Sequence, residues 1–199
     1  MANRIRELLN QMAVLENELQ TALQEEESQV LFKIRGKRVE FERAVREKHR
    51  QMRTSLVKWL GESQIRAILS VPFIYSVAIP IALLDLWITL YQAVCFPLYR
   101  VAKVKRSDYI VIDRHRLGYL NSIEKFNCVY CGYGNGVIAY AREVAARTEQ
   151  YWCPIKHARR VLGTHSRYAQ FLAYGDAVDY QAKLNEFRRS LAPKETKAS

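Results

Sequence analysis

Acidic residues are scarce in this chain, and the familiar signatures of catalysis are missing from it. Its 199 residues include 20 Asp and Glu against 31 Lys and Arg, which leaves a net charge of +11. We find no P-loop, no HExxH sequence, no dinucleotide fingerprint and no Ser-His-Asp grouping on a nucleophile elbow. The sequence therefore leans away from an enzyme. Its excess of positive charge predicts an anionic partner, either nucleic acid or a membrane surface.

Charge is almost absent from one long block. Residues 67–99 contain a single formal charge, Asp85. An apolar run of more than ~18 residues is typical of a membrane segment. A buried helical hairpin of a soluble protein is the alternative, but the segments on either side are too polar to cover it. The block is also remote from the first residues and has no cleavage site of small residues, so it does not resemble a signal peptide. We predict that residues 67–100 are embedded in a membrane.

The length of this block favours a hairpin. As one straight helix it would measure about 50 Å, whereas the hydrocarbon core of a bilayer is ~30 Å thick. Two short legs would bring Asp85 to the apex, in contact with water, while a single span would bury this charge near the bilayer centre. Prolines interrupt the block, and basic residues flank it on both sides, which indicates that both ends stay in the cytoplasm. We predict a helical membrane hairpin; one tilted, kinked span is the alternative.

The N-terminal region, residues 1–66, has the pattern of a coiled coil followed by a basic amphipathic helix. Apolar residues recur at spacings of three and four, which predicts a seam that pairs with a second copy of the chain: Ile5, Leu8, Met12, Leu15, Leu19 and Ala22. From Val30 to Trp59, Lys and Arg crowd the polar faces, as in helices that lie on anionic membranes. A solvated face of the coiled coil would explain the same charges. Nucleic acid is the weaker candidate, because no aromatic-interleaved binding motif accompanies the arginines.

Three of the four cysteines and one histidine have the spacing of a metal site. A C-x2-C pair is followed by a C-x3-H pair, formed by Cys128, Cys131, Cys153 and His157. Tetrahedral zinc takes four soft or borderline ligands, and pairs separated by two to four residues can aim two side chains at one ion. We predict a structural Cys3His zinc site. Cys95, inside the membrane block, is expected to act as a small apolar residue.

The first thiol pair also resembles a known metal-binding knuckle. The hexapeptide "CVYCGY" is similar to the first knuckle of rubredoxins and zinc ribbons, and Cys153 with Pro154 resembles the opening of the second. The resemblance implies a tight turn in which Gly132 has a positive φ. The resemblance ends at Lys156, the position where these families have their fourth cysteine. This sequence has His157 one place later, and a histidine ligand favours zinc over a one-iron centre. The overall arrangement resembles bacterial inner-membrane proteins that have no assigned activity.

Two other interpretations of the thiols stay open. Cys128 and Cys131 could form a thiol redox centre at the start of a helix, since a helix N-terminus lowers the pKa of a thiol. The cysteines could also be buried without metal. His115 and His165 are possible substitutes for the fourth ligand.

The remaining C-terminal sequence predicts a small α+β domain over residues 101–190. A β-branched run indicates a strand at Asp108–Arg114, and helical patterns cover residues 136–151 and 179–191. Residues 191–199 are expected to be a disordered tail.

Together these patterns predict a mainly α protein of the inner membrane, with both terminal regions in the cytoplasm. We expect a membrane-anchored scaffold or accessory subunit, stapled by structural zinc. Its expected partners are anionic lipid headgroups, a second copy through the coiled coil, and an unidentified membrane protein. A membrane-bound thiol-disulfide redox protein that uses Cys128 and Cys131 is the alternative function.

Overall fold

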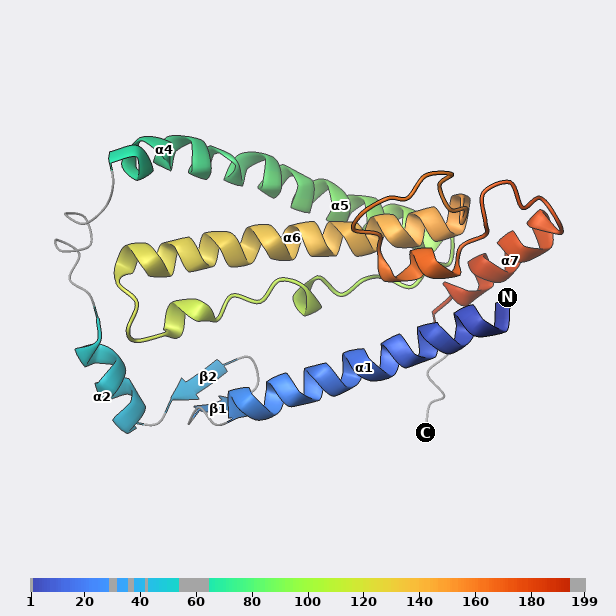
Figure 1. The fold of residues 1–199 in the computed structure, drawn as a ribbon. Coiled ribbons are helices and arrows are strands. Elements are labelled where there is room, and N and C mark those ends of the chain that lie inside the picture. Colours follow the sequence, from blue (N-terminus) through green and yellow to red (C-terminus); the bar gives the residue numbers. More distant parts are fainter. Residues whose placement is uncertain (1, 29–31, 36–37, 42, 54–64, 194–199) are drawn as a thin grey trace.

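The computed structural model describes residues 2–28, 32–35, 38–41, 43–53 and 65–193 (Figure 1). The chain is mainly α-helical, which confirms the coarsest part of the predicted fold class. The α-helices are α1 (Ala2–Ser28), α2 (Arg43–Gln51), α4 (Ile65–Ser76), α5 (Ala78–Leu98), α6 (Ser122–Trp152) and α7 (Tyr180–Ser190). Short 3-10 turns are η1 (Arg106–Asp108), η2 (Arg114–Arg116) and η3 (Ser166–Gln170), and the strands are β1 (Phe32–Arg35) and β2 (Arg38–Phe41).

The N-terminal region begins with the long helix that the sequence predicts. The coiled coil concerns a second copy of the chain, so it stays a prediction. The continuous basic helix after it is wrong, because β1 and β2 pair as an antiparallel hairpin in which Phe32 lies opposite Phe41. Apolar residues alternate with charged ones there, and this period of two suits a strand rather than a helix. Residues 54–64, the last part of the predicted helix, lie outside the described ranges.

Helices α4 and α5 follow one another in the same direction, with a bend at Val77 (Figure 1). The predicted hairpin is therefore wrong. Pro80 lies in the first turn of α5, where a helix tolerates its missing N–H, so the proline bends the chain without reversing it. Hydrogen bonds from Val77 N to Ile74 O (3.3 Å) and from Ile81 N to Val77 O (3.2 Å) carry the chain through the bend. Residues Ile68–Leu98 are long and apolar enough to cross a membrane.

After α5 the chain runs back along the bundle before α6 begins, so that α5 and α6 are parallel (Figure 1). We call residues 100–121 the return segment. Near the start of α6, the Tyr75 hydroxyl of α4 donates a hydrogen bond to Asn127, and near its end, the hydroxyls of Tyr91 in α5 and Thr148 lie 3.0 Å apart. The predicted strand at Asp108–Arg114 is wrong, since this part of the return segment forms turns and irregular chain packed on α6.

The core joins α5, the return segment, α6 and the end of the chain. Its buried members are Phe96, Val101, Val104, Tyr140, Val144 and Leu191. Leu191, where the predicted last helix meets the predicted tail, is only 4% exposed, and its carbonyl accepts a hydrogen bond from Ala102 N (2.9 Å). The C-terminal helix is thereby fixed to the start of the return segment. Residues 194–199 of the predicted tail lie outside the described ranges.

Candidate functional site

The four predicted metal ligands are spread along α6 and beyond it. Cys128 and Cys131 lie within α6, Cys153 caps its C-terminus, and His157 follows in a loop. At 1.5 Å per residue, Cys131 and Cys153 are separated by about 33 Å along the helix axis. Within the described ranges, no three His, Cys, Asp or Glu side chains gather as a metal ion would require. This arrangement does not fit one ion bound by all four residues, and the zinc site stays a prediction that the fold does not support.

A capping box explains why helix precedes the thiols. Asn121 is fully buried, and its side-chain oxygen accepts a hydrogen bond from Glu124 N (3.0 Å). The Glu124 carboxylate in turn accepts one from Asn121 N (2.8 Å). This reciprocal pair fixes the start of α6 at Ser122, before the first cysteine. The signal is present in the sequence as "NSIE", and it outweighs the local likeness to a metal-binding turn.

The glycines that follow the thiols lie within α6, and one of them, Gly136, is a close packing position. Gly132 lies inside α6, and the described glycines with a positive φ are Gly163 and Gly175, so the expected knuckle conformation is absent from α6. A Cβ atom placed on Gly136 would come 2.8 Å from Tyr109 O, closer than side chains approach a carbonyl. A glycine at this position therefore lets the return segment lie directly against the helix backbone.

The positions of the thiols give little support to redox chemistry. Cys128 lies nearly two turns beyond the start of α6, whereas the dipole effect of a helix N-terminus is confined to its first turn. Burial raises the pKa of the Cys153 thiol, and the nearby Glu149 carboxylate raises it further. At neutral pH this thiol is thus held protonated, the less reactive form. The redox function also stays a prediction.

The one charge of the apolar block points into the bundle, where two elements bind it. Arg106 of the return segment donates from Nε to Asp85 Oδ1 (2.9 Å) and from Nη2 to Oδ2 (2.6 Å). The Tyr133 hydroxyl of α6 donates to the same Oδ2 (2.9 Å). The Asp85 side chain is 11% exposed, so this ion pair sits at the junction of α5, α6 and the return segment rather than at an apex. The sequence marked Asp85 but could not supply its partners, which lie 21 and 48 residues away.

Gln92 makes a second polar connection about two turns further along α5. Its amide nitrogen donates to Val104 O (3.1 Å), and its oxygen accepts from Val104 N (2.9 Å). The buried Tyr140 hydroxyl also contacts this amide. Gln92 therefore pairs with the return segment as a neighbouring strand would, and it satisfies backbone groups that would otherwise be buried without partners.

Helix α5 has two faces of opposite character. Positions at alternating spacings of three and four are buried or half-buried and face the bundle: Ala78, Ile81, Asp85, Ile88, Gln92, Cys95 and Tyr99. We call the opposite side of α4 and α5 the outer face; its exposed apolar residues include Ile68, Leu69, Phe73, Ile79, Leu83, Leu86, Trp87, Leu90, Val94 and Leu98. An exposed apolar surface of this length normally marks a membrane or protein contact.

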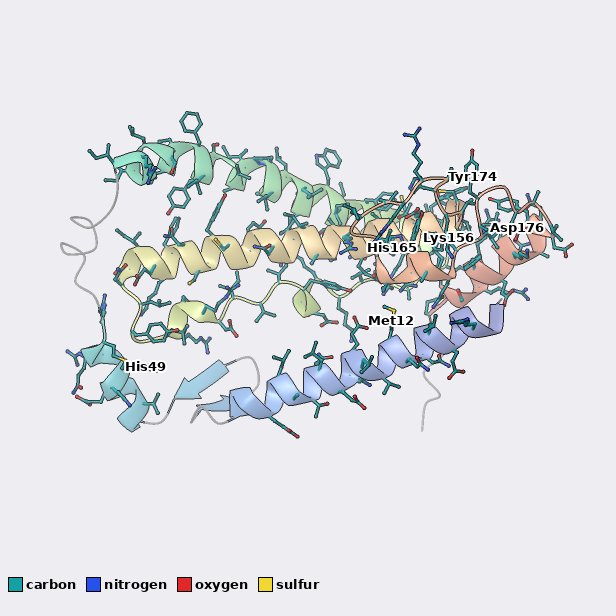
Figure 2. All side chains as sticks on the ribbon, in the orientation of Figure 1. Met12, His49, Lys156, His165, Tyr174 and Asp176 are labelled. Atoms are coloured by element: carbon teal, nitrogen blue, oxygen red, sulfur yellow. The ribbon has the colours of Figure 1, made fainter. Side chains whose placement is uncertain are left out.

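A separate ionic network holds the C-terminal loops on α6. Glu143 of α6 accepts hydrogen bonds from Arg147 Nε (2.8 Å) and from Arg167 Nη2 (2.9 Å) of η3. Burial pushes the pKa of Glu143 upward, but the two guanidinium groups outweigh burial and hold the pKa below its ordinary value. His165, the possible substitute for the fourth metal ligand, lies close to α6 (Figure 2). Its Nε2 atom is 2.8 Å from Oε2 of Glu149, a residue of α6. His115 lies in η2.

Comparisons of the chain with family models, with curated proteins and with solved structures give no match.

Proposed function

We propose that this chain is a membrane-associated binding protein, a scaffold or accessory subunit whose outer face contacts the lipid. The observation that carries the proposal is the outer face itself, which is apolar along the whole length of α4 and α5 while the single charge of that block, Asp85, is turned inward and paired. Burying each leucine-sized side chain contributes about 1.5–3 kcal/mol, so a face of this size supports stable association.

The distribution of charge supports an anionic membrane as the contact. The chain carries a net charge of +11, and basic residues stand on both sides of the apolar block. These residues favour the cytoplasmic leaflet, which carries anionic lipids. The bilayer in this proposal is the inner membrane, with both terminal regions in the cytoplasm.

Partners other than lipid would use the parts that project from this anchor. Helix α1 exposes Leu8, Met12, Leu15 and Leu19, the seam that the sequence assigns to self-association (Met12 is labelled in Figure 2). The segment after α6, residues 153–193, is tied to that helix by the ion pair of Arg167 with Glu143 and presents exposed basic side chains at Arg159 and Arg160. In this proposal α1 binds a second copy of the chain, and the segment after α6 binds another membrane component.

The proposal is tested by charging the outer face. Leu83, Trp87 and Leu90 are all at least half exposed, so replacing them with Glu leaves the core intact. We expect the triple variant to lose at least tenfold of its binding to vesicles of phosphatidylglycerol and phosphatidylethanolamine, measured by flotation. Leu162→Glu with Val178→Glu, at apolar positions after α6 that are even more exposed, is the control and should bind as the unaltered chain does. Unchanged binding of the triple variant would refute the proposal.

A further inference from the structure

We infer that α4 and α5 lie in the plane of the bilayer, along the headgroup boundary of one leaflet, rather than across it. This inference rests on the proposed function, because it concerns how the outer face meets the lipid. It departs from the length and composition of Ile68–Leu98, which suffice for a span.

The return segment is the first reason. It runs beside α5 and α6 for their shared length (Figure 1), and its exposed residues include Lys103, Lys105, Asp108 and Arg114. Much of its backbone is irregular. Lipid-exposed irregular backbone does not occur in the hydrocarbon region, and charged side chains there are costly. If α5 crossed the membrane in this conformation, the return segment would have to cross beside it.

The return segment is held to the helices at several levels. Gln92 pairs with the backbone of Val104 near the end of α5, and Arg106 binds Asp85 further back. Beyond these contacts, Ile110 lies against the bare backbone of α6 at Gly136. Inserting α5 alone would break its contacts with Val104 and Arg106, while the segment stayed packed on α6, and would leave Asp85 without its cation in the lipid.

The direction of polarity is the second reason. A spanning helix is apolar around its circumference and polar at its ends, whereas a helix in the interface is polar on one side. In α5 the inward side carries Asp85, Gln92 and the hydroxyl of Tyr91, while the outer face is apolar from end to end. As a helix, the 31 residues would measure about 46 Å, well over the ~30 Å hydrocarbon core of a bilayer. In the plane of the membrane, a helix of this length needs neither tilt nor a change in bilayer thickness.

The flanking charge identifies the occupant as an anionic lipid surface. Arg66 lies at the start of α4, and Arg100 and Lys103 follow α5. A span would place these ends on opposite sides of the membrane, but an in-plane helix brings both to the same leaflet, where cations bind anionic headgroups. An apolar stripe between basic ends is complementary to the headgroup boundary of a phosphatidylglycerol membrane.

The depth of three outer-face positions tests the inference. Phe73, Leu83 and Val94 are all exposed and are distributed along α4 and α5. A single tryptophan is placed at each in turn, in the full chain with Trp59, Trp87 and Trp152 replaced by Phe. Each protein is bound to phosphatidylglycerol and phosphatidylethanolamine vesicles, and its depth is measured by fluorescence quenching with lipids brominated at different acyl positions. We expect the same shallow depth at all three positions, within about one helical turn, 5 Å.

A span gives a different result. Phe73 and Val94 would lie roughly 15 Å from Leu83 along the axis, so Leu83 would be near the bilayer centre and the other two near opposite headgroups. Binding with such graded depths would uphold the membrane function and overturn the in-plane arrangement. Absence of binding would overturn both. Equal binding to pure phosphatidylcholine vesicles would overturn the assignment of the anionic lipid, for which we expect at least a tenfold preference.

Discussion

Asp85 and Arg106 form a two-point ion pair that ties the middle of α5 to the return segment. Replacing Asp85 by Asn keeps the shape of the side chain but removes the charge that faces Arg106. We expect a loss of about 1.5–3 kcal/mol in the free energy of unfolding, toward the lower value because the Arg106 side chain is 45% exposed. Thermal unfolding in one detergent measures this change. Lys103→Ala, an exposed cation of the same segment, should leave the midpoint within a degree or two of the unaltered chain.

Gly136 and Gly132 offer the same substitution in two different environments. At Gly136 an added methyl would meet Tyr109 O at 2.8 Å and Ile110 Cα at 2.9 Å, so Gly136→Ala must displace the return segment, at a cost of about 1–3 kcal/mol. At Gly132 the nearest atoms are 3.5 and 3.6 Å away, which is ordinary contact, and Gly132→Ala should stabilise α6 by up to ~1 kcal/mol. Denaturant unfolding compares the two. Equal effects would contradict the proposed close approach at Gly136.

The lowered pKa of Glu143 makes the free energy of unfolding depend on pH. Because Arg147 and Arg167 hold its folded-state pKa below the ordinary value, Glu143 contributes stability that is fully present above the unfolded pKa of ~4.3 and is lost as pH falls through the folded pKa. Glu143→Gln should therefore be less stable than the unaltered chain at pH 7, by about 1–3 kcal/mol, and the difference should shrink below about pH 4.5. Unfolding curves at pH 3–7 measure it. A difference that is constant with pH would assign the loss to packing instead.

Variants of the predicted metal ligands distinguish the observed helical fold from a structural zinc site. Cys131 and His157 are exposed, so Cys131→Ser and His157→Ala should each change stability by no more than about 0.5 kcal/mol. A structural Cys3His site predicts instead that both variants lose metal and unfold. Metal content and melting of the purified full chain decide between them. Cys95→Ser, in the half-buried inward face of α5, is the comparison in which we expect the larger loss.

Helix α1 predicts self-association through its exposed apolar seam. Leu15 and Leu19 are 63% and 61% exposed in the single chain. Leu15→Glu would place a charge in the seam, and we expect it to convert an oligomer to a monomer in light-scattering mass measurements. Glu16→Gln, one residue away and off the seam, should leave the mass unchanged. A monomeric unaltered chain would remove the coiled coil from the interpretation.

The sequence predicted those features that depend on local periodicity. The helix at the N-terminus, the apolar block and the helical pattern after Gly136 all follow from spacings within a few turns. Features set by distant contacts were missed. The sequence places Asp85 in an apolar run but does not show that Arg106 and Tyr133 bind it. Without these partners, a water-exposed apex is the position that stabilises the charge.

The turn predicted at the thiol motif is replaced by helix for a related reason. Six residues around Cys128 are compatible with a metal-binding turn or with a helix, and the choice is made by Asn121 and Glu124 upstream and by the packing of Gly136 downstream. Residue spacing alone predicted the four ligands to be neighbours, whereas a helix of this length holds them apart.

The parallel course of α5 and α6 has an electrostatic consequence at one end of the bundle. Parallel helices align their dipoles, so the negative ends of both, at Leu98 and Trp152, gather at the same place. Arg188 of α7 is located there: its Nε donates to Tyr151 O (3.1 Å), and its guanidinium lies 4.9 Å from the centre of the Tyr151 ring. Arg188 thus places a positive charge at the C-terminal end of α6, and its attraction to the partial negative charge there helps to hold α7 in position.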